Sequence, residues 1–244
     1  EDSFTVAIED DYPTDDRMPN FGIAPTLTAD KRNDLLTILG EYKYVFRPSL
    51  GKTDVVVHTL DLQDSTPVVG PMYRIAESMK PAFEQEVQRL LDEDVLAECQ
   101  SPYHSPIIPI LKADGSLRLV NNFKQLNSKI RDDQFMMANP YEIVTKAASK
   151  PFLSQVDLSK AYLQVCLDKR FHHVTAWSCY LGQFCWKRMA QGLSGAPRTM
   201  QRLITTLLKN TSKFASALQD NIVIYSNTWE EHCAHIKEIL NRLR

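Results

Sequence analysis

The sequence lacks any long hydrophobic run. No stretch of its 244 residues approaches the roughly 20 apolar residues that a membrane-spanning helix needs, so no membrane partner is expected. Its five cysteines are an odd number without the regular spacing of a disulfide framework. No secretory signal opens the chain, which begins at Glu1 in the manner of an excised fragment. These absences predict an intracellular protein with reduced cysteines, either nuclear or cytoplasmic.

A strong net charge is also missing, although the charge is unevenly distributed. The formal net charge is −2, and residues 1–16 hold seven acids and no base. The rest of the chain has 28 Lys and Arg against the remaining 23 acids, a net charge of +5. A mildly basic body is compatible with nucleic-acid contact, but this value is common at such a length. We expect residues 1–26 to form an acidic tail or linker.

The composition is sufficient for one large domain or two small ones, at 43% hydrophobic and 24% charged residues. No internal repeat is visible. In the first half, apolar spacing predicts a helix that Thr28 caps and that runs to about Tyr42, with Leu35, Leu36, Leu39 and Tyr42 on one face. A strand within residues 46–62 and a helix capped by Ser78 follow. Two further strands join at residues 113–115, and Pro140 is expected to open another helix.

The second half alternates strands with helices. A strand ends near Asp157 and precedes a short helix, and a hairpin turns at Leu181-Gly182. A Gly-rich turn leads into a helix within residues 191–209, and a last helix begins with a capping box formed by Thr228 and Glu231. This order of elements predicts an α+β fold with antiparallel sheets.

The stretch SALQDNIVIY, residues 216–225, predicts a β-hairpin whose tight turn contains Asp220-Asn221. Asn and Asp are common in turns because they tolerate the backbone conformation. The pair is therefore either an ordinary turn or an active site in which an amide has replaced a carboxylate.

Four segments in order then resemble reverse transcriptases, specifically those of gypsy-class long-terminal-repeat retrotransposons. They are SPYHSPIIPILKADGSLRLVNNFKQLN, VDLSKAYLQV, RMAQGLSGAPRTMQRLI and LQDNIVIYSNTWEEHCAHI. The resemblance spans Leu27 to Arg244. It implies the fingers and palm of a right-hand fold, with the fingers and an N-terminal helix in residues 27–150, an incomplete palm in 151–244, and no thumb.

The resemblance implies a site for two Mg²⁺ ions, which prefer oxygen ligands. Asp157 matches the carboxylate of the first catalytic motif, and Asp220 matches the first of an adjacent Asp pair. Asn221 then stands at the second position of that pair. A shift by one residue places Gln219-Asp220 there instead, and in either case one carboxylate has become an amide. The site is therefore expected to be degenerate, with Mg²⁺ required only if activity remains.

The resemblance also implies a nucleotide-binding role for Lys112, Arg118, Tyr162, Gln191 and Gly192. The two basic side chains suit a triphosphate. Each position also has a purely structural interpretation. Lys112 and Arg118 would lie on a solvated hairpin face, Tyr162 would pack in the core, and the turn with Gly192 would be a tight entry into a helix.

Two further features bear on the loss of activity and on metals. Residues 121–124 read NNFK where the family commonly has valine, aspartate, tyrosine and arginine, a second departure from an active enzyme. His232, Cys233 and His235 do not have the spacing of a zinc finger, so no zinc site is expected.

Three hypotheses follow. In the first, the domain has lost polymerisation and serves as a scaffold that binds a protein partner, with RNA or an RNA–DNA hybrid as a further ligand. In the second, it is an active or weakly active RNA-directed DNA polymerase. In the third, it is a relic without function, which the helical periodicity of its core disfavours.

Overall fold

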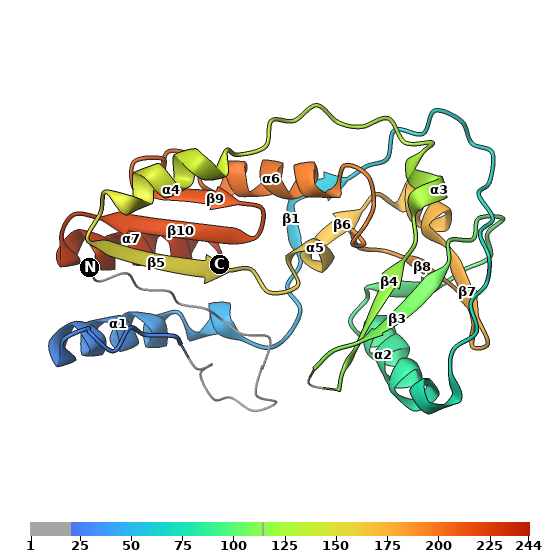
Figure 1. The fold of residues 1–244 in the computed structure, drawn as a ribbon, viewed down its shortest axis with the longest axis horizontal. Coiled ribbons are helices and arrows are strands. Elements are labelled where there is room, and N and C mark those ends of the chain that lie inside the picture. The colour runs from blue at the N-terminus through green and yellow to red at the C-terminus, as the bar shows by residue number, and fades with distance from the viewer. Residues whose placement is uncertain (1–20, 114) are drawn as a thin grey trace. The chain divides into compact units, whose positions relative to one another are not determined.

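A computed structural model describes residues 21–113 and 115–244 of the chain. The acidic residues 1–16 and Asp114 lie outside the described residues. Contacts divide the described chain into two compact units (Figure 1). The first unit comprises residues 21–49, 136–159 and 200–244, and the second comprises 50–135 and 160–199. The division into a tail (1–26), fingers with the N-terminal helix (27–150) and palm (151–244) stays a prediction.

The first unit is built on a three-stranded antiparallel sheet of order β5-β10-β9. The strands are β5 (Phe152–Asp157), β9 (Ala215–Leu218) and β10 (Asn221–Ser226). Alternate residues point to one face, as the period of a strand requires, so Val156, Ile222 and Ile224 are buried there. The same alternation places Asp157 and Asn221 together on the opposite face.

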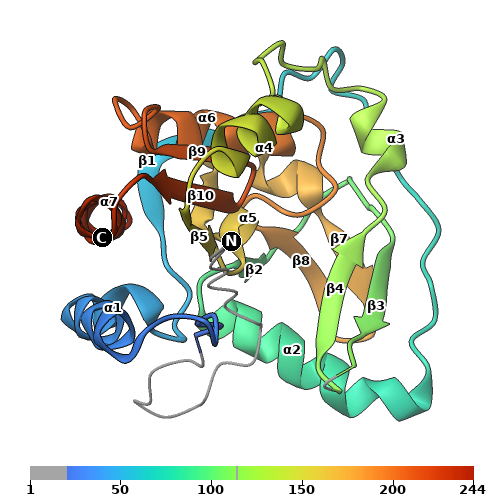
Figure 2. The ribbon, with the colours of Figure 1, turned by 60° about the vertical axis from the view of Figure 1, so that its left-hand side comes forward.

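Four helices accompany this sheet, and Figures 1 and 2 show them around it. They are α1 (Ala29–Glu41), α4 (Pro140–Ala148), α6 (Ala196–Leu207, whose first turn belongs to the second unit) and α7 (Trp229–Arg242). Helix α7 packs on β10 and β5, α1 packs on α7, and α4 lies along β10 and β9. The apolar side chains of α1 and α7 thus cover the buried face of the sheet.

The second unit contains three small sheets. Strands β2, β8 and β7 form one in that order, β3 pairs with β4, and β1 pairs with β6. The strands are β1 (Thr53–His58), β2 (Leu96–Glu98), β3 (Ile107–Leu111), β4 (Leu117–Asn121), β6 (Val165–Leu167), β7 (Trp177–Cys179) and β8 (Gly182–Trp186). The helices are α2 (Lys80–Asp92), α3 (Lys124–Asn127) and α5 (Ala161–Gln164), with short 3₁₀ turns at Glu77–Met79 and Lys169–Thr175. Phe83, Trp177 and Phe184 form an aromatic core between α2 and the three-stranded sheet.

Most predicted elements are confirmed, including the three hairpins and the capping box of α7. Several details were wrong. The second hairpin turns at Tyr180-Leu181, one residue before the expected Leu181-Gly182, because Cys179 already pairs with Gly182. Ser78 does not cap α2, because a 3₁₀ turn precedes the helix and Met79 holds the cap position. Leu36, expected on the inner face of α1, is exposed, and Ile38 is buried instead. The β1–β6 pair is parallel, whereas antiparallel sheets alone were expected. Among the described residues, no helix is long and apolar enough to cross a membrane.

Candidate functional site

Asp157 lies at the end of β5, directly opposite Asn221 on β10. The next residue along the chain, Leu158, donates its backbone N–H to the carbonyl of Asp220 at 3.0 Å. Because antiparallel pairing fixes which residues face each other, the strand register alone brings Asp157, Asp220 and Asn221 to one edge of the first unit. The structure therefore groups the three residues for which the sequence suggested a metal site.

The hairpin turn consists of Gln219 and Asp220, since Leu218 and Asn221 are paired across it. The expected turn pair Asp220-Asn221 was wrong by one residue, because Asn221 is already the first residue of β10. Gln219 adopts a left-handed backbone with φ of 55°, which primed hairpin turns require and which non-glycine residues adopt at a cost. Its N–H lies 3.3 Å from the side-chain oxygen of Gln201 on α6, and this contact supports the turn.

The Asn221 side chain is engaged at both ends. Its Oδ1 accepts a hydrogen bond from Nε2 of Gln155 at 2.6 Å, and its Nδ2 donates to Oδ1 of Asp220 at 3.3 Å. A carboxylate at this position would repel Asp220, whereas the amide binds it. Gln155 was not singled out from the sequence, since only the strand register shows that it lies diagonal to Asn221.

These residues do not fit a two-metal site. Each Mg²⁺ is best held by anionic carboxylates, and this edge of the sheet offers Asp157 and Asp220 but no third acid. The oxygen of Asn221 that could replace a carboxylate oxygen already accepts from Gln155. Within the described part of the chain, no cluster of three or more His, Cys, Asp or Glu side chains is arranged to hold a metal.

The nucleotide-binding candidates all lie on the second unit. Lys112 and Arg118 lie on the β3–β4 hairpin, where the backbone N–H of Lys112 donates to the carbonyl of Ser116 and Arg118 faces Ile110 across the pair. Arg118 is exposed and Lys112 is half-buried. Tyr162 belongs to α5 and is half-buried.

Lys160 adds a cation that the sequence analysis missed. It precedes α5 with a left-handed backbone, φ of 47°. Burial lowers the pKa of its ammonium below the usual range, and the positive charges of Arg89 and Lys112 lower it further, against the opposing effect of Glu93 and Glu86. Lys160 therefore lies among charges of both signs, of which Arg89, Glu93 and Glu86 affect its pKa more than Lys112 does.

The Gly-rich turn before α6 is held rigidly. Asn127 donates its Nδ2 to the carbonyl of Gly192 at 2.8 Å and accepts from the N–H of Ser194 at 2.8 Å. Gly192 has φ of +88°, a conformation that side chains rarely adopt, and Gln191 beside it is exposed. The structural interpretation of this turn is therefore sufficient to explain its glycine.

The histidines near the C-terminus form a hydrogen-bonded network in place of a metal site. The buried ring of His232 contacts Ser154 Oγ through Nε2 and Ser226 Oγ through Nδ1, each at 2.9 Å. Ser226 Oγ also lies 2.7 Å from Nδ1 of His235, which stacks on Phe214. Burial lowers the pKa of His232 to about 4, so the ring is neutral near pH 7.

Comparisons with known proteins agree with this arrangement. The family model described as reverse transcriptase (RNA-dependent DNA polymerase) matches residues 110–244. The chain is 28% identical over 220 residues to the Pol polyprotein of transposon 297 of Drosophila melanogaster, covering 87% of this chain and 21% of that protein. It is 29% identical over 164 residues to the enzymatic polyprotein of Cauliflower mosaic virus (strain Strasbourg), covering 66% of this chain and 24% of the viral protein. The chain thus spans about a quarter or less of the length of these relatives.

Solved structures show the same fold. A foamy viral protease–reverse transcriptase in complex with RNA/DNA hybrid superposes with a TM-score of 0.81 at 23% identity, over 89% of this chain and 30% of the viral one. A related form in complex with double-stranded DNA gives 0.80 over 89% and 39%. The predicted right-hand fold is confirmed over its fingers and palm region. The family model covers more than half of the chain, and the chain belongs to the reverse transcriptase (RNA-dependent DNA polymerase) family.

Proposed function

We propose that this chain is a reverse-transcriptase-like domain of gypsy-class origin that no longer polymerises DNA and acts as a scaffold for a protein or RNA partner. In this proposal, the candidate site retains two of the three acids that a polymerase site would have. Asp157 and Asp220 correspond to metal ligands, and Asn221 replaces a third. Residues 27–150 correspond to fingers and residues 151–244 to the palm.

The observation that carries this proposal is the bonding of Asn221. Its amide satisfies Gln155 and Asp220 together. A metal at this edge would have to displace the Gln155 hydrogen bond and would gain no negative charge from Asn221. The arrangement is therefore satisfied as a polar contact of the sheet, and catalysis would need a negative charge at position 221.

Binding of RNA is supported by the cations of the second unit. Lys112 and the exposed Arg118 lie on one hairpin, and Lys160 is a further cation of the same unit. Phosphate groups would neutralise such a cluster. The structural relatives bind an RNA/DNA hybrid and double-stranded DNA, which makes nucleic acid a reasonable ligand for this chain too.

The competing function is an RNA-directed DNA polymerase that uses Mg²⁺. The pairing of Asp157 with Asn221 favours it, because a single side-chain change at position 221 would bring a third acid beside Asp157 and Asp220. The two functions differ in one measurable property, which is extension of a primer.

The test titrates a labelled RNA–DNA hybrid with and without Mg²⁺ and runs primer extension on the same samples. We expect hybrid binding by the wild type, no extension, and extension by Asn221→Asp at least about a thousandfold faster. Hybrid binding without extension by Asn221→Asp would support a nucleic-acid scaffold. The absence of both hybrid binding and extension would support a protein scaffold. Wild-type extension that Asp157→Ala abolishes would show that the protein is a polymerase and overturn the proposal.

A further inference from the structure

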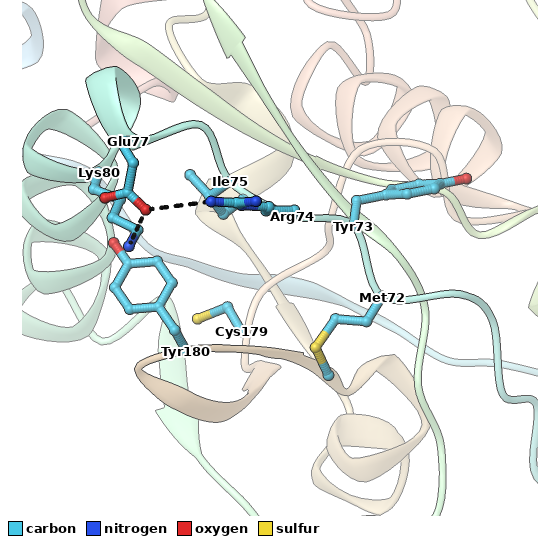
Figure 3. A pocket seen from close by; sticks show the side chains of 8 residues that line it. All are labelled: Met72, Tyr73, Arg74, Ile75, Glu77, Lys80, Cys179 and Tyr180. Atoms are coloured by element: carbon cyan, nitrogen blue, oxygen red, sulfur yellow. Dashed lines mark ion pairs between the residues drawn. The ribbon is translucent and has the colours of Figure 1, made fainter.

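A pocket of about 370 Å³ lies on the second unit, away from the residues assigned above (Figure 3). It lies between the segment that leads into α2 and the turn that joins β7 to β8. Met72 and Ile75 line it from the first side, and Cys179 and Tyr180 from the second. Met72 and Tyr180 are exposed, while Ile75 is buried at its base. The lining is therefore mostly apolar although solvent reaches it.

One positive charge in this pocket is incompletely neutralised. Glu77 pairs with Lys80 at 2.8 Å, and the Lys80 ammonium also lies 4.9 Å from the centre of the Tyr180 ring. Arg74 reaches the same carboxylate only at 3.9 Å, beyond hydrogen-bond distance, and its side chain is 88% exposed. Two cations thus share one acid, and the guanidinium of Arg74 keeps its bidentate donor pair for another anion.

The backbone beside the pocket has unused hydrogen-bonding groups. Within the part of the chain that the structure describes, no hydrogen bond involves the N–H or carbonyl groups of Met72, Tyr73, Arg74 or Ile75. On the other side of the pocket, β7 is one of the two edge strands of its sheet and ends at Cys179. Backbone N–H and carbonyl groups without partners, as in residues 72–75, are the feature that binds a peptide as an added strand.

We propose that this pocket binds an extended peptide segment of a partner protein that carries an acidic side chain next to a large apolar one. The peptide backbone would pair with residues 72–75, the carboxylate would bind Arg74, and the apolar side chain would contact Met72, Ile75 and Cys179. A peptide is favoured over a nucleic acid because the unused groups are backbone amides, and because Met72, Ile75 and Cys179 offer apolar side chains between the two tyrosines of the lining. The inference goes beyond the proposed function, since a polymerase could carry the same pocket.

The experiment selects a displayed random octapeptide library on the wild-type protein and measures binding of the resulting consensus peptide by fluorescence anisotropy. Arg74→Glu and Met72→Asp change two exposed side chains of the pocket and are checked for folding by circular dichroism. Arg131→Glu is the matched control, because this arginine is also exposed on the second unit and pairs with Asp61 only at 3.7 Å. We expect a consensus with Asp or Glu beside an apolar residue. Arg74→Glu should weaken its binding about tenfold or more, Met72→Asp should weaken it too, and Arg131→Glu should leave it within twofold.

Three results would overturn the proposal. The first is the absence of a consensus, and the second is a consensus peptide that the wild type and Arg74→Glu bind equally well. The third is binding of labelled RNA–DNA hybrid that Arg74→Glu weakens, because the pocket would then bind nucleic acid instead. The same titrations on Asn221→Asp separate this site from the proposed function. Peptide affinity should not change in that variant, whether or not it extends a primer.

Discussion

At the residue scale, two asparagines do what neither an aliphatic side chain nor a carboxylate could do in their place. Asn221 accepts from Gln155 and donates to Asp220. Asn121, buried at the end of β4, accepts from the indole N–H of Trp186 at 2.8 Å and donates to the carbonyl of Ser105 at 3.1 Å. Both side chains need a donor and an acceptor together, which only the amide offers. The sequence showed Asn121 as a departure from the family pattern, and the structure gives it a role.

Asn121→Leu should lower the free energy of unfolding by about 2–3 kcal/mol, because the buried indole N–H of Trp186 would lose its acceptor. Urea unfolding measures this. Asn122→Asp is the control. Asn122 is exposed, and its side-chain oxygen accepts from the N–H of Lys124, which a carboxylate can also do. This variant should differ from the wild type by less than about 0.5 kcal/mol. Equal losses in both variants would contradict the assigned role of Asn121.

His232 should make the protein less stable in mild acid. Its pKa is about 4 in the folded protein against 6.5 in an unfolded chain, so the unfolded state binds the proton more readily. The stabilisation is complete above pH 6.5 and is lost as the pH falls towards 4. Between pH 7 and pH 5 this histidine should contribute a loss of about 2 kcal/mol.

The measurement compares urea unfolding of the wild type and His232→Gln at both pH values. Glutamine can keep hydrogen bonds to Ser154 and Ser226 but does not titrate, so the variant should lose about 2 kcal/mol less than the wild type. His58, whose pKa burial also lowers to about 4, remains in both proteins and sets the residual slope. Identical slopes would exclude His232 as a source of the pH dependence.

At the element scale, helix ends show which local signals the structure uses. Thr228 accepts from the N–H of Glu231, and the side chain of Glu231 returns the bond to the N–H of Thr228, which completes the capping box of α7. Thr28 stands at the same position of α1 but makes no side-chain cap hydrogen bond. The sequence assigned the two threonines the same role, yet only one fulfils it.

Thr228→Ala should therefore destabilise the protein by about 1 kcal/mol, while Thr28→Ala should be close to neutral. Thermal unfolding of the two variants and the wild type, under one set of conditions, makes the comparison. A similar loss in both would mean that the cap bond of Thr228 contributes nothing beyond the intrinsic preference for threonine at a helix start.

The elements themselves were largely predictable because their signals are local. A short hydrophobic run marked β10, and Thr228 with Glu231 marked the start of α7. The parallel partnership of β1 with β6 was not predictable, since more than 100 residues separate the strands and neither carries a pairing signal. The contact of Gln155 with Asn221 was hidden for the same reason. At the candidate site, the acids could be found from motifs. Their hydrogen bonds depend on the strand register, and a shift of one residue would turn each side chain to the other face of the sheet.

At the scale of the whole molecule, the chain passes between its two units four times, so neither unit is a continuous segment. The sheet of the first unit illustrates the consequence. Its buried face carries Val156 and Ile224, and it is covered partly by Leu35 and Leu39 of α1, which precede the sheet by more than 100 residues. A fragment cut from the chain would therefore lack some of the side chains that cover a core in the full chain.

A fragment of residues 151–244, the predicted palm, should therefore fail to fold alone. It contains the sheet and α7 but lacks α1 and α4. Without α1, the buried side chains Leu35, Ile38 and Leu39 no longer cover the sheet and α7. Each such side chain stabilises by about 1.5–3 kcal/mol when buried, and together they approach the 5–15 kcal/mol that holds a typical domain.

The fragment should show no cooperative thermal transition and poorly dispersed amide NMR resonances. Co-expression with residues 21–49 and 136–150 should restore part of the dispersion, because those segments complete the same unit. Cooperative unfolding of the fragment alone would show instead that the sheet and α7 are sufficient, and that α1 is an accessory layer.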